Sequence, residues 1–150
     1  MSLHFSAAVE QIAETNPDTV TVLYLSWLPR RLSRLALAAQ TKGQRYITTE
    51  FRQMEFMPVV GVLWPKHKAR EFLRWTETNP RRLGHKQPRS DDHVAGRWAT
   101  FTKQTVRFTV PSIVQHPDEE KSLIGRKAHW GKDKGRTALL FAEDASVFSW

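Results

Sequence analysis

The chain has 150 residues, contains no cysteine, and carries 23 Lys and Arg side chains against 15 Asp and Glu, a formal net charge of +8. This length suits one domain with its own hydrophobic core, and the lack of cysteine excludes disulfides and thiolate metal sites. The positive charge attracts phosphate, nucleotides, nucleic acid or an anionic surface without choosing among them. With no apolar run long enough to span a bilayer and no signal-peptide pattern at the start, the sequence predicts a cytoplasmic protein.

Hydrophobic periodicity and turn residues divide the first third of the chain into helices and strands. Apolar residues over 5–13 recur at helical spacing, and Asn16-Pro17-Asp18 ends that helix. Residues 19–26 form a near-continuous apolar run, which is typical of a strand covered on both faces. A second helix follows Pro29 and closes at Gly43. Its predicted inner face consists of Leu32, Leu35, Ala36 and Ala39.

The middle of the chain continues this alternation. Residues 45–48 are a short strand candidate, and residues 58–63 are a second buried strand candidate. Pro65 starts a third helix, Ser90 caps a fourth, and residues 106–110 form another strand. The residues predicted to face the core are Ala69, Phe72, Leu73 and Trp75 in the third helix and Val94, Trp98 and Phe101 in the fourth.

The order of these elements predicts a layered α/β fold with a small mixed or parallel sheet flanked by helices. We expect a single domain over residues 1–150. Within it, we expect residues 116–136 to form a mobile basic tail loop and residues 137–142 to return to the core.

Two adjacent carboxylates, Asp91 and Asp92, open the fourth predicted helix. Acidic side chains at a helix start stabilise it by about 0.3–1 kcal/mol through the helix dipole, which is one explanation of the pair. The other is a general base or a ligand-orienting carboxylate, because the active sites of α/β folds gather where strands end and helices begin. The sequence leaves both explanations open.

The remaining chemistry-bearing residues follow the last predicted strand. His116 is either a ligand for a transition metal such as Mn, Fe or Zn, or an ordinary surface residue. Arg126 and Lys127 stand among glycines, in a segment that is either a solvated loop or one that folds over a diphosphate or a nucleic acid. Trp130 in the same segment can stack on a sugar or a base, or simply pack.

Four stretches carry a resemblance to a known family. They are Asn16-Pro17-Asp18 before the strand that begins at Val20, Phe56-Met57-Pro58-Val59-Val60-Gly61-Val62-Leu63-Trp64-Pro65, Ser90-Asp91-Asp92 with Gly96-Arg97-Trp98, and Thr109-Val110-Pro111-Ser112-Ile113-Val114-Gln115-His116 with Ser122-Leu123-Ile124-Gly125. In this order they resemble the C-terminal part of a GT-A-fold glycosyltransferase, and most of all small glycosyltransferase-like proteins of actinobacteria and their phages. The Pro-Ser-Ile-Val-Gln-His string is also similar to one in the branching N-acetylglucosaminyltransferases.

The resemblance implies a truncated GT-A fold that transfers a sugar from a nucleotide-sugar donor to an acceptor hydroxyl. It implies that Asp91 or Asp92 is the catalytic base and that His116 completes a site for a divalent metal, Mn or Mg. The implied donor-binding residues are Arg126, Lys127 and Trp130. If the protein is phage-encoded, its implied location is the host cytoplasm or the virion.

Enzymes of this family carry an Asp-x-Asp or Asp-Asp motif on an earlier strand, and no Asp-x-Asp occurs in the 150 residues. The resemblance therefore leaves open a working transferase and a truncated or inactive one. A different function also remains open: a non-catalytic basic protein that binds nucleic acid, a virion component or a host protein on the same scaffold. The missing half further implies a bare sheet edge, which a second copy or a partner chain would cover.

Overall fold

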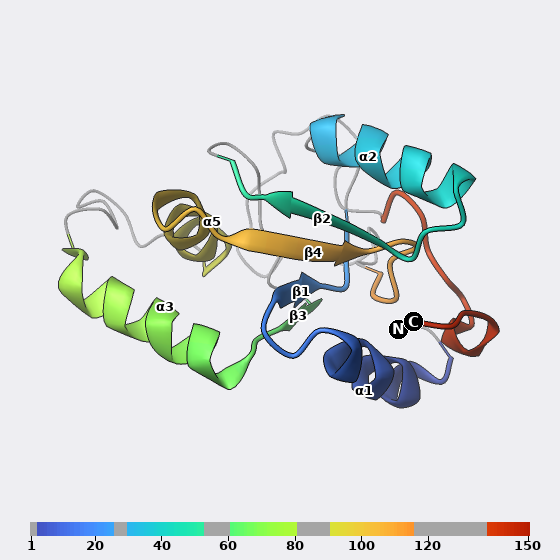
Figure 1. The fold of residues 1–150 in the computed structure, drawn as a ribbon, viewed down its shortest axis with the longest axis horizontal. Helices are drawn as coiled ribbons and strands as arrows, with labels where there is room; N and C mark the ends of the chain where they lie inside the picture. The colour runs from blue at the N-terminus through green and yellow to red at the C-terminus, as the bar shows by residue number, and fades with distance from the viewer. Residues whose placement is uncertain (1–2, 26–29, 53–60, 81–90, 116–137) are drawn as a thin grey trace, which may run out of the picture.

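The computed structural model describes residues 3–25, 30–52, 61–80, 91–115 and 138–150, so the expected tail loop over 116–136 lies outside the described residues. The helices are α1 (Phe5–Thr15), α2 (Arg30–Thr41), α3 (Lys66–Thr78), α5 (Asp91–Phe101) and the short 3-10 helix η2 (Ala145–Val147). The strands are β1 (Val20–Val22), β2 (Tyr46–Glu50), β3 (Val62–Leu63) and β4 (Thr105–Thr109). The predicted order of helices and strands is confirmed (Figure 1).

The strands form one mixed sheet in the order β2-β4-β1-β3. The inner pair β1 and β4 is parallel, with Val22 opposite Phe108, whereas β2 and β3 run antiparallel to their neighbours. The chain is therefore an α/β fold in layers with a small mixed sheet, as the sequence predicts. β2 and β3 are the outer strands, and the edge of β2 is contacted by Arg31, whose Nη2 donates to the carbonyl of Glu50 (3.3 Å).

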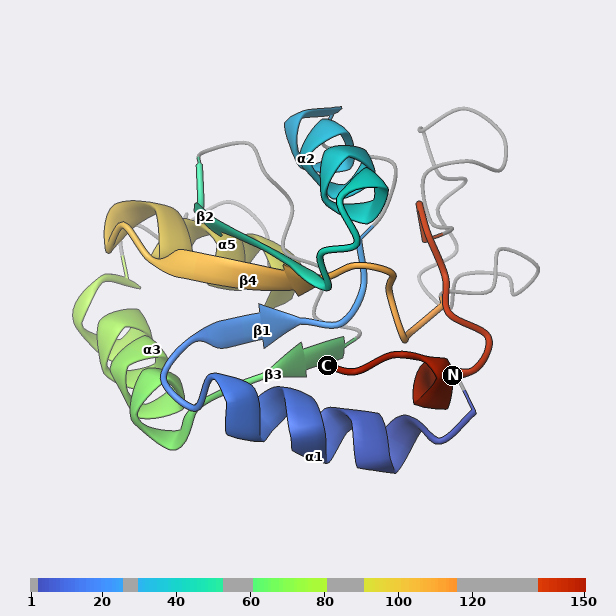
Figure 2. The same cartoon turned by 45° about the vertical axis from the view of Figure 1, so that its right-hand side comes forward.

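The two faces of the sheet differ in polarity. Apolar side chains point to one face and join the larger core cluster with residues of α2, α3 and α5; they are Val20, Val22, Ile47, Val106 and Phe108. Because side chains alternate along a strand, the intervening residues Thr21, Arg107 and Thr109 lie on the opposite face, where they are also buried. Helix α1 and the C-terminal segment lie on this second side of the sheet (Figure 2).

The buried guanidinium of Arg107 joins α1 to the sheet. Its Nη2 donates to the carbonyl of Ile12 (2.6 Å) and its Nε to Thr21 Oγ1 (3.0 Å), while its Cζ lies 4.2 Å from the centre of the Tyr46 ring. The carbonyl of Ile12 belongs to the last turn of α1, where the negative end of the helix dipole favours a cation. Burial lowers the pKa of Arg107, an effect that Tyr46 opposes, and a guanidinium keeps its proton in proteins.

Three residues predicted to face the core are largely exposed. The exposed fractions are 39% for Leu35, 58% for Leu73 and 48% for Phe101, so these predictions were wrong. In α2 and α5 the sheet-facing positions are taken by small residues, among them Ala36, Ala39, Ala95, Gly96 and Ala99. Small side chains allow a helix to approach a sheet closely, and this rotates the larger neighbouring side chains toward solvent.

The two apolar runs form shorter strands than predicted. The run over 19–26 pairs as a strand only at Val20–Val22, although burial continues to Leu25. Of the run over 58–63, residues 58–60 lie outside the described residues, and Val62 and Leu63 form a half-buried edge strand rather than a buried one. An edge strand has a neighbouring strand on one side only and is therefore more exposed than an inner strand. The apolar content of the run did not indicate this position in the sheet.

Replacing Arg107 by Met keeps the apolar stem but removes two buried hydrogen bonds from a charged donor. Since such bonds contribute about 1.5–3 kcal/mol each and Met recovers part of the loss by packing, we expect the free energy of unfolding to fall by about 2–4 kcal/mol. Urea unfolding followed by circular dichroism measures the change. The control is Arg70→Met on the exposed side of α3, which removes the same charge and should stay within about 0.5 kcal/mol of the parent. Equal stability of the two variants would contradict the role given to Arg107.

Candidate functional site

Strands β1 and β4 end side by side, and other segments of the chain meet them there. Leu23 N donates to the carbonyl of Gly61 (2.8 Å), Ile113 N to that of Leu23 (3.0 Å), and Leu139 N to that of Leu25 (2.8 Å). We call this region, residues 23–25, 109–115 and 138–142, the carboxyl edge. In open α/β sheets, ligands bind outside the carboxyl ends of the parallel strands. The carboxyl edge therefore has the position of a ligand-binding site.

Ser112 is the centre of the hydrogen bonds at the carboxyl edge. Its Oγ accepts from Leu25 N (2.9 Å), its N donates to the carbonyl of Leu140 (2.8 Å), and its carbonyl accepts from Ala142 N (2.9 Å). Gln115 acts in the same way, because its Oε1 accepts from the backbone N of Ala138 (2.6 Å). The turn after β4 thus holds the C-terminal segment on the sheet, which confirms that residues 138–142 return to the core.

The described part of the carboxyl edge is closely packed. The space between Leu25, Thr109 and Leu139 has no room for a water molecule. A Cβ on Gly61 would lie 2.9 Å from Val114 Cγ2, so the backbone approaches more closely here than any other residue allows. These residues form a floor, and a ligand at this edge would have to lie on top of it.

Asp91 and Asp92 stand in the first turn of α5, at the positive end of the helix dipole. Asp91 is exposed and Asp92 is half-buried. Helix α5 turns back into β4 through residues 102–104, where Gln104 N donates to the carbonyl of Ala99 (2.8 Å). In Figure 1 α5 is seen nearly end-on beside the start of β4, so the helix crosses the strand rather than running along it.

The other predicted site residues, His116, Arg126, Lys127 and Trp130, lie outside the described residues. The structure therefore does not test whether they meet the two aspartates. Within the described ranges, no group of three or more His, Asp or Glu side chains lies close enough together to hold a metal ion. The Mn or Mg site that the resemblance implies includes His116 and so extends outside the described residues. None of the described helices is long and apolar enough to cross a membrane.

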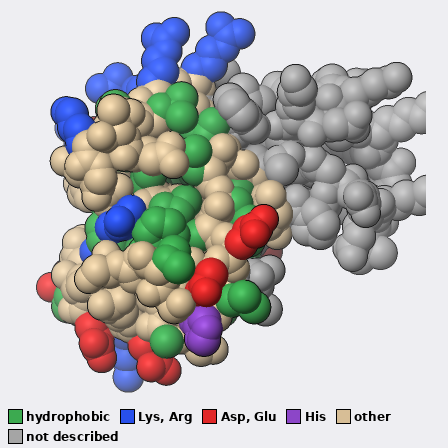
Figure 3. Space-filling model, turned by 90° about the vertical axis from the view of Figure 1, so that its right-hand side faces the viewer, with side chains coloured by type: hydrophobic (Ala, Val, Ile, Leu, Met, Phe, Trp, Pro, Cys, Tyr) green, Lys and Arg blue, Asp and Glu red, His purple; other side chains and the backbone are tan. Residues whose placement is uncertain are grey.

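A groove with a volume of about 440 Å³ lies between α1 and the C-terminal segment. It is lined by His4, Ala7, Ala8, Glu10, Gln11, Glu14, Ala145, Ser146, Phe148 and Trp150. Trp150 closes one side, because its Nε1 donates to the carbonyl of Ala145 (3.0 Å) and its N to Gln11 Oε1 (3.3 Å). Acidic side chains gather in the lower half of the face shown in Figure 3, beside a histidine. The lining comes from both ends of the sequence, so no local motif could have predicted this groove.

Asp144 stands beside this groove and is held by Ser146, whose N and Oγ both donate to Asp144 Oδ1 (2.8 and 2.7 Å). These bonds lower the pKa of the Asp144 carboxyl, and the nearby His4 adds to the effect. The carboxylate therefore stays charged at neutral pH and adds negative potential to this side of the molecule.

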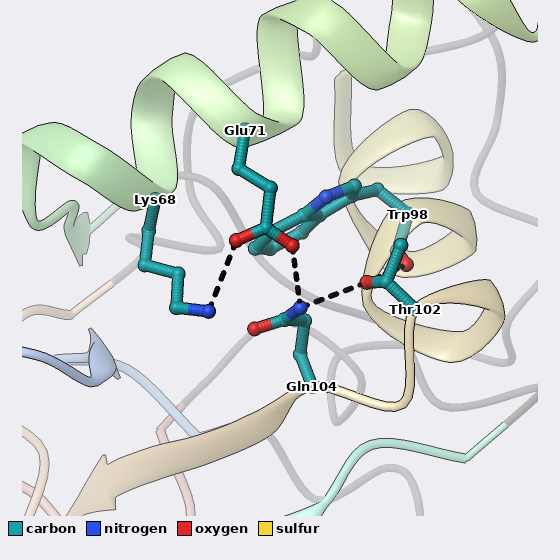
Figure 4. Close-up of polar contacts among 5 residues, drawn as sticks. All are labelled: Lys68, Glu71, Trp98, Thr102 and Gln104. Atoms are coloured by element: carbon teal, nitrogen blue, oxygen red, sulfur yellow. Dashed lines mark hydrogen bonds and ion pairs between the residues drawn. The ribbon is translucent and has the colours of Figure 1, made fainter.

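A further polar cluster connects α3 to the start of β4 (Figure 4). Gln104 Nε2 donates to Glu71 Oε1 (2.9 Å) and to Thr102 Oγ1 (3.0 Å), and Lys68 Nζ lies 3.0 Å from Glu71 Oε2. Gln104 is 8% exposed, and these bonds satisfy its buried amide. The cluster lies at the opposite end of β4 from the carboxyl edge. Its role in satisfying the buried amide of Gln104 accounts for its geometry.

No protein-family model matches the chain, and no curated protein or solved structure matches it either. Two surfaces of the chain itself are candidates for a functional site. The carboxyl edge has the position of an α/β active site, whereas the groove beside α1 has the volume of a binding site.

Ser112→Ala removes the acceptor of the buried amide of Leu25. A buried donor without a partner costs about 1–3 kcal/mol, so we expect the free energy of unfolding to fall by that amount. Hydrogen exchange at the Leu25 amide should become faster in the same variant. The control is Ser149→Ala, which removes an exposed hydroxyl and should change stability by less than about 0.5 kcal/mol. An unchanged exchange rate at Leu25 would contradict the role of Ser112.

Proposed function

We propose that this chain is a glycosyltransferase-like protein that transfers a sugar from a nucleotide-sugar donor to an acceptor hydroxyl at the carboxyl edge. The observation that carries the proposal is topological. Strands β1 and β4 end in parallel at this edge, and α5, the helix that leads into β4, carries two carboxylates in its first turn. The resemblance of the turn after β4, Pro-Ser-Ile-Val-Gln-His, to the same family supports the proposal independently of the topology.

In the proposed reaction Asp91 or Asp92 acts as the general base. Its carboxylate accepts the proton of the acceptor hydroxyl as that oxygen bonds to the anomeric carbon and the bond to the nucleoside diphosphate breaks. Asp91 is exposed and therefore accessible to an acceptor, whereas Asp92 is half-buried.

The donor side of the proposal involves residues outside the described part of the chain. Arg126 and Lys127 would neutralise the charge on the departing diphosphate, and Trp130 would stack on the sugar or the base. A divalent metal, Mn or Mg, would stabilise the same charge, with His116 among its ligands.

The first test is donor binding. Thermal unfolding of the protein is measured with each common nucleoside diphosphate, with and without Mn²⁺. A nucleotide present at about 100 times its dissociation constant stabilises the folded state by about 2.7 kcal/mol, which is a readily measured shift. We expect one nucleotide to give this shift. If none changes the unfolding temperature, the chain alone is not a working transferase.

The second test separates catalysis from helix capping. Asn in place of Asp91 or Asp92 can still accept hydrogen bonds at a helix start, but it cannot accept a proton. We expect one of the variants Asp91→Asn and Asp92→Asn to lose about 10²–10⁴-fold in the transfer rate, measured as release of the nucleoside diphosphate that binds. Nucleotide binding should persist, and stability should change by no more than about 1 kcal/mol. Two variants with parental transfer rates would rule out the aspartates as the base.

A second candidate function is binding to the phosphate backbone of nucleic acid, and a feature of α3 favours it. Lys66, Arg70 and Arg74 are exposed and recur every four residues. Residues at this spacing share one side of a helix, so they form a basic stripe about 12 Å long. A linear array of cations of this kind can contact consecutive phosphates.

Alanine at these three positions tests the second candidate. For duplex DNA, each phosphate contact contributes about 0.9 to the slope of log affinity against log salt, so we expect the slope to fall by about 2–3. The charge-matched control replaces Lys42, Arg52 and Lys103, exposed residues outside α3, by alanine. Equal losses in the two variants would show that the stripe on α3 is not the contact surface.

A further inference from the structure

The charges of this chain are strongly separated. Residues 1–29 and 138–150 carry five acidic side chains and no Lys or Arg, whereas all 23 basic side chains lie between Arg30 and Arg136. The fold brings the two acidic segments together, because Leu3 pairs with Asp144 and Leu3 N donates to the carbonyl of Glu143 (2.7 Å). On the face shown in Figure 3, Lys and Arg side chains project from the top and acidic side chains occupy the lower half. Although the net charge is +8, the molecule therefore has an acidic side formed by residues 3–25 and 138–150, which we call the acidic pole.

The groove beside α1 lies at this acidic pole and has the chemistry of a cation site. Glu10 and Glu14 are one helical turn apart on α1, both are exposed, and both line the groove. On the other side, the guanidinium of Arg45 lies 4.5 Å from the ring centre of Phe148, so this ring already has its cation within the chain. Ala7, one turn before Glu10 on the same side of α1, adds an apolar wall. Two carboxylates beside an apolar wall suit arginine side chains.

Helix α2 presents the complementary surface. Arg30 and Arg34 are exposed and stand one helical turn apart, the same spacing as Glu10 and Glu14. Leu37, one turn further along the same side, is 44% exposed. Within the described residues, neither these arginines nor the two glutamates form an ion pair. Two matched pairs of opposite charge on two helices, with an exposed leucine beside one pair, are the elements of a contact between copies.

We propose that the groove beside α1 binds helix α2 of a second copy of this chain. Arg30 and Arg34 of one copy face Glu14 and Glu10 of the next, and Leu37 contacts the apolar wall of the groove. Helix α2 lies above the sheet in Figure 1 and α1 below it, so the contact joins two different surfaces, is head-to-tail and leaves one surface of each kind free. Such contacts propagate into open chains or close into rings.

The excess positive charge of each copy sets the conditions for this contact. Two copies of charge +8 repel each other at long range, whereas the paired side chains attract at contact distance. At an ionic strength of 0.1 M the Debye length is about 10 Å, which screens the long-range repulsion more than the contact. Association should therefore be strongest at moderate salt and weaker at about 1 M, where the ion pairs are screened as well.

The experiment measures mass in solution by light scattering coupled to size exclusion, over a range of protein concentrations in 0.1 M salt. We expect the average mass of the parent to rise with concentration to at least twice the 17.4 kDa of one chain. Glu10→Lys/Glu14→Lys and Arg30→Glu/Arg34→Glu should each remain at the mass of one chain, because each variant presents like charges on both surfaces. Mixed in equal amounts, they should regain the parental mass, because each groove then faces an oppositely charged α2.

The control is Glu50→Lys/Glu77→Lys, which changes the net charge as Glu10→Lys/Glu14→Lys does but at exposed sites on β2 and α3. Circular dichroism confirms that each variant is folded. A parent that keeps the mass of one chain at every concentration overturns the proposal, as does a mixture of the two swapped variants that fails to associate. A parent of single-chain mass that binds an arginine-rich peptide would assign the groove to a different, cationic partner and would equally overturn the contact between copies.

Discussion

The hydrogen bonds of one buried cation, Arg107, determine how α1 is placed, and much of the molecule depends on that placement. The N–H donors of a buried guanidinium need hydrogen-bond acceptors, and its charge needs a favourable neighbour. Here a threonine of β1 and a helix carbonyl accept hydrogen bonds, and a tyrosine ring lies against the cation. Because α1 offers a carbonyl from its last turn, the cation also interacts with the negative end of a helix dipole. The helix thus docks on a polar patch of the sheet without a carboxylate partner among the described residues. Together with the apolar packing of Ala8 and Ile12, this placement of the helix forms one wall of the groove beside α1.

The order of elements could be predicted because it depends on local signals. The asparagine-proline pair after α1, the glycine after α2, whose φ is +66°, and the alternation of apolar runs with helical patterns all act within a few residues. Which side of a helix becomes buried could not be predicted in the same way. Leu73 and Phe101 have the spacing of core residues, yet their exposure depends on how closely α3 and α5 approach the sheet and each other. That distance is set by the tryptophan and phenylalanine rings between them, which lie 5.2–5.7 Å apart.

In the candidate site, too, the residues with local sequence signals could be predicted and those with distant partners could not. Asp91 and Asp92 were identified because helix starts and acidic residues are both local features, and the structure places them in the first turn of α5. The roles of Arg107 and Ser112 could not be recognised, because their partners are distant in sequence. Arg107 donates to a carbonyl 95 residues away, and Ser112 accepts from an amide 87 residues away. Backbone groups carry no sequence signature, so a side chain that bonds to them gives no pattern to detect. The groove beside α1 is subject to the same limit, since its lining combines both ends of the chain.

The separation of charge connects the two surfaces. An anionic ligand is attracted to the basic part of the chain and repelled by the acidic pole, because fields from exposed charges extend about one Debye length, roughly 8–10 Å, in ordinary salt. The carboxyl edge lies between these regions: the C-terminal segment leaves it at Ala142 and enters the acidic pole at Glu143 and Asp144. A phosphate-bearing ligand would therefore approach the edge from the side that faces away from α1. The same polarity favours contact between unlike poles of two copies over any contact between like ones.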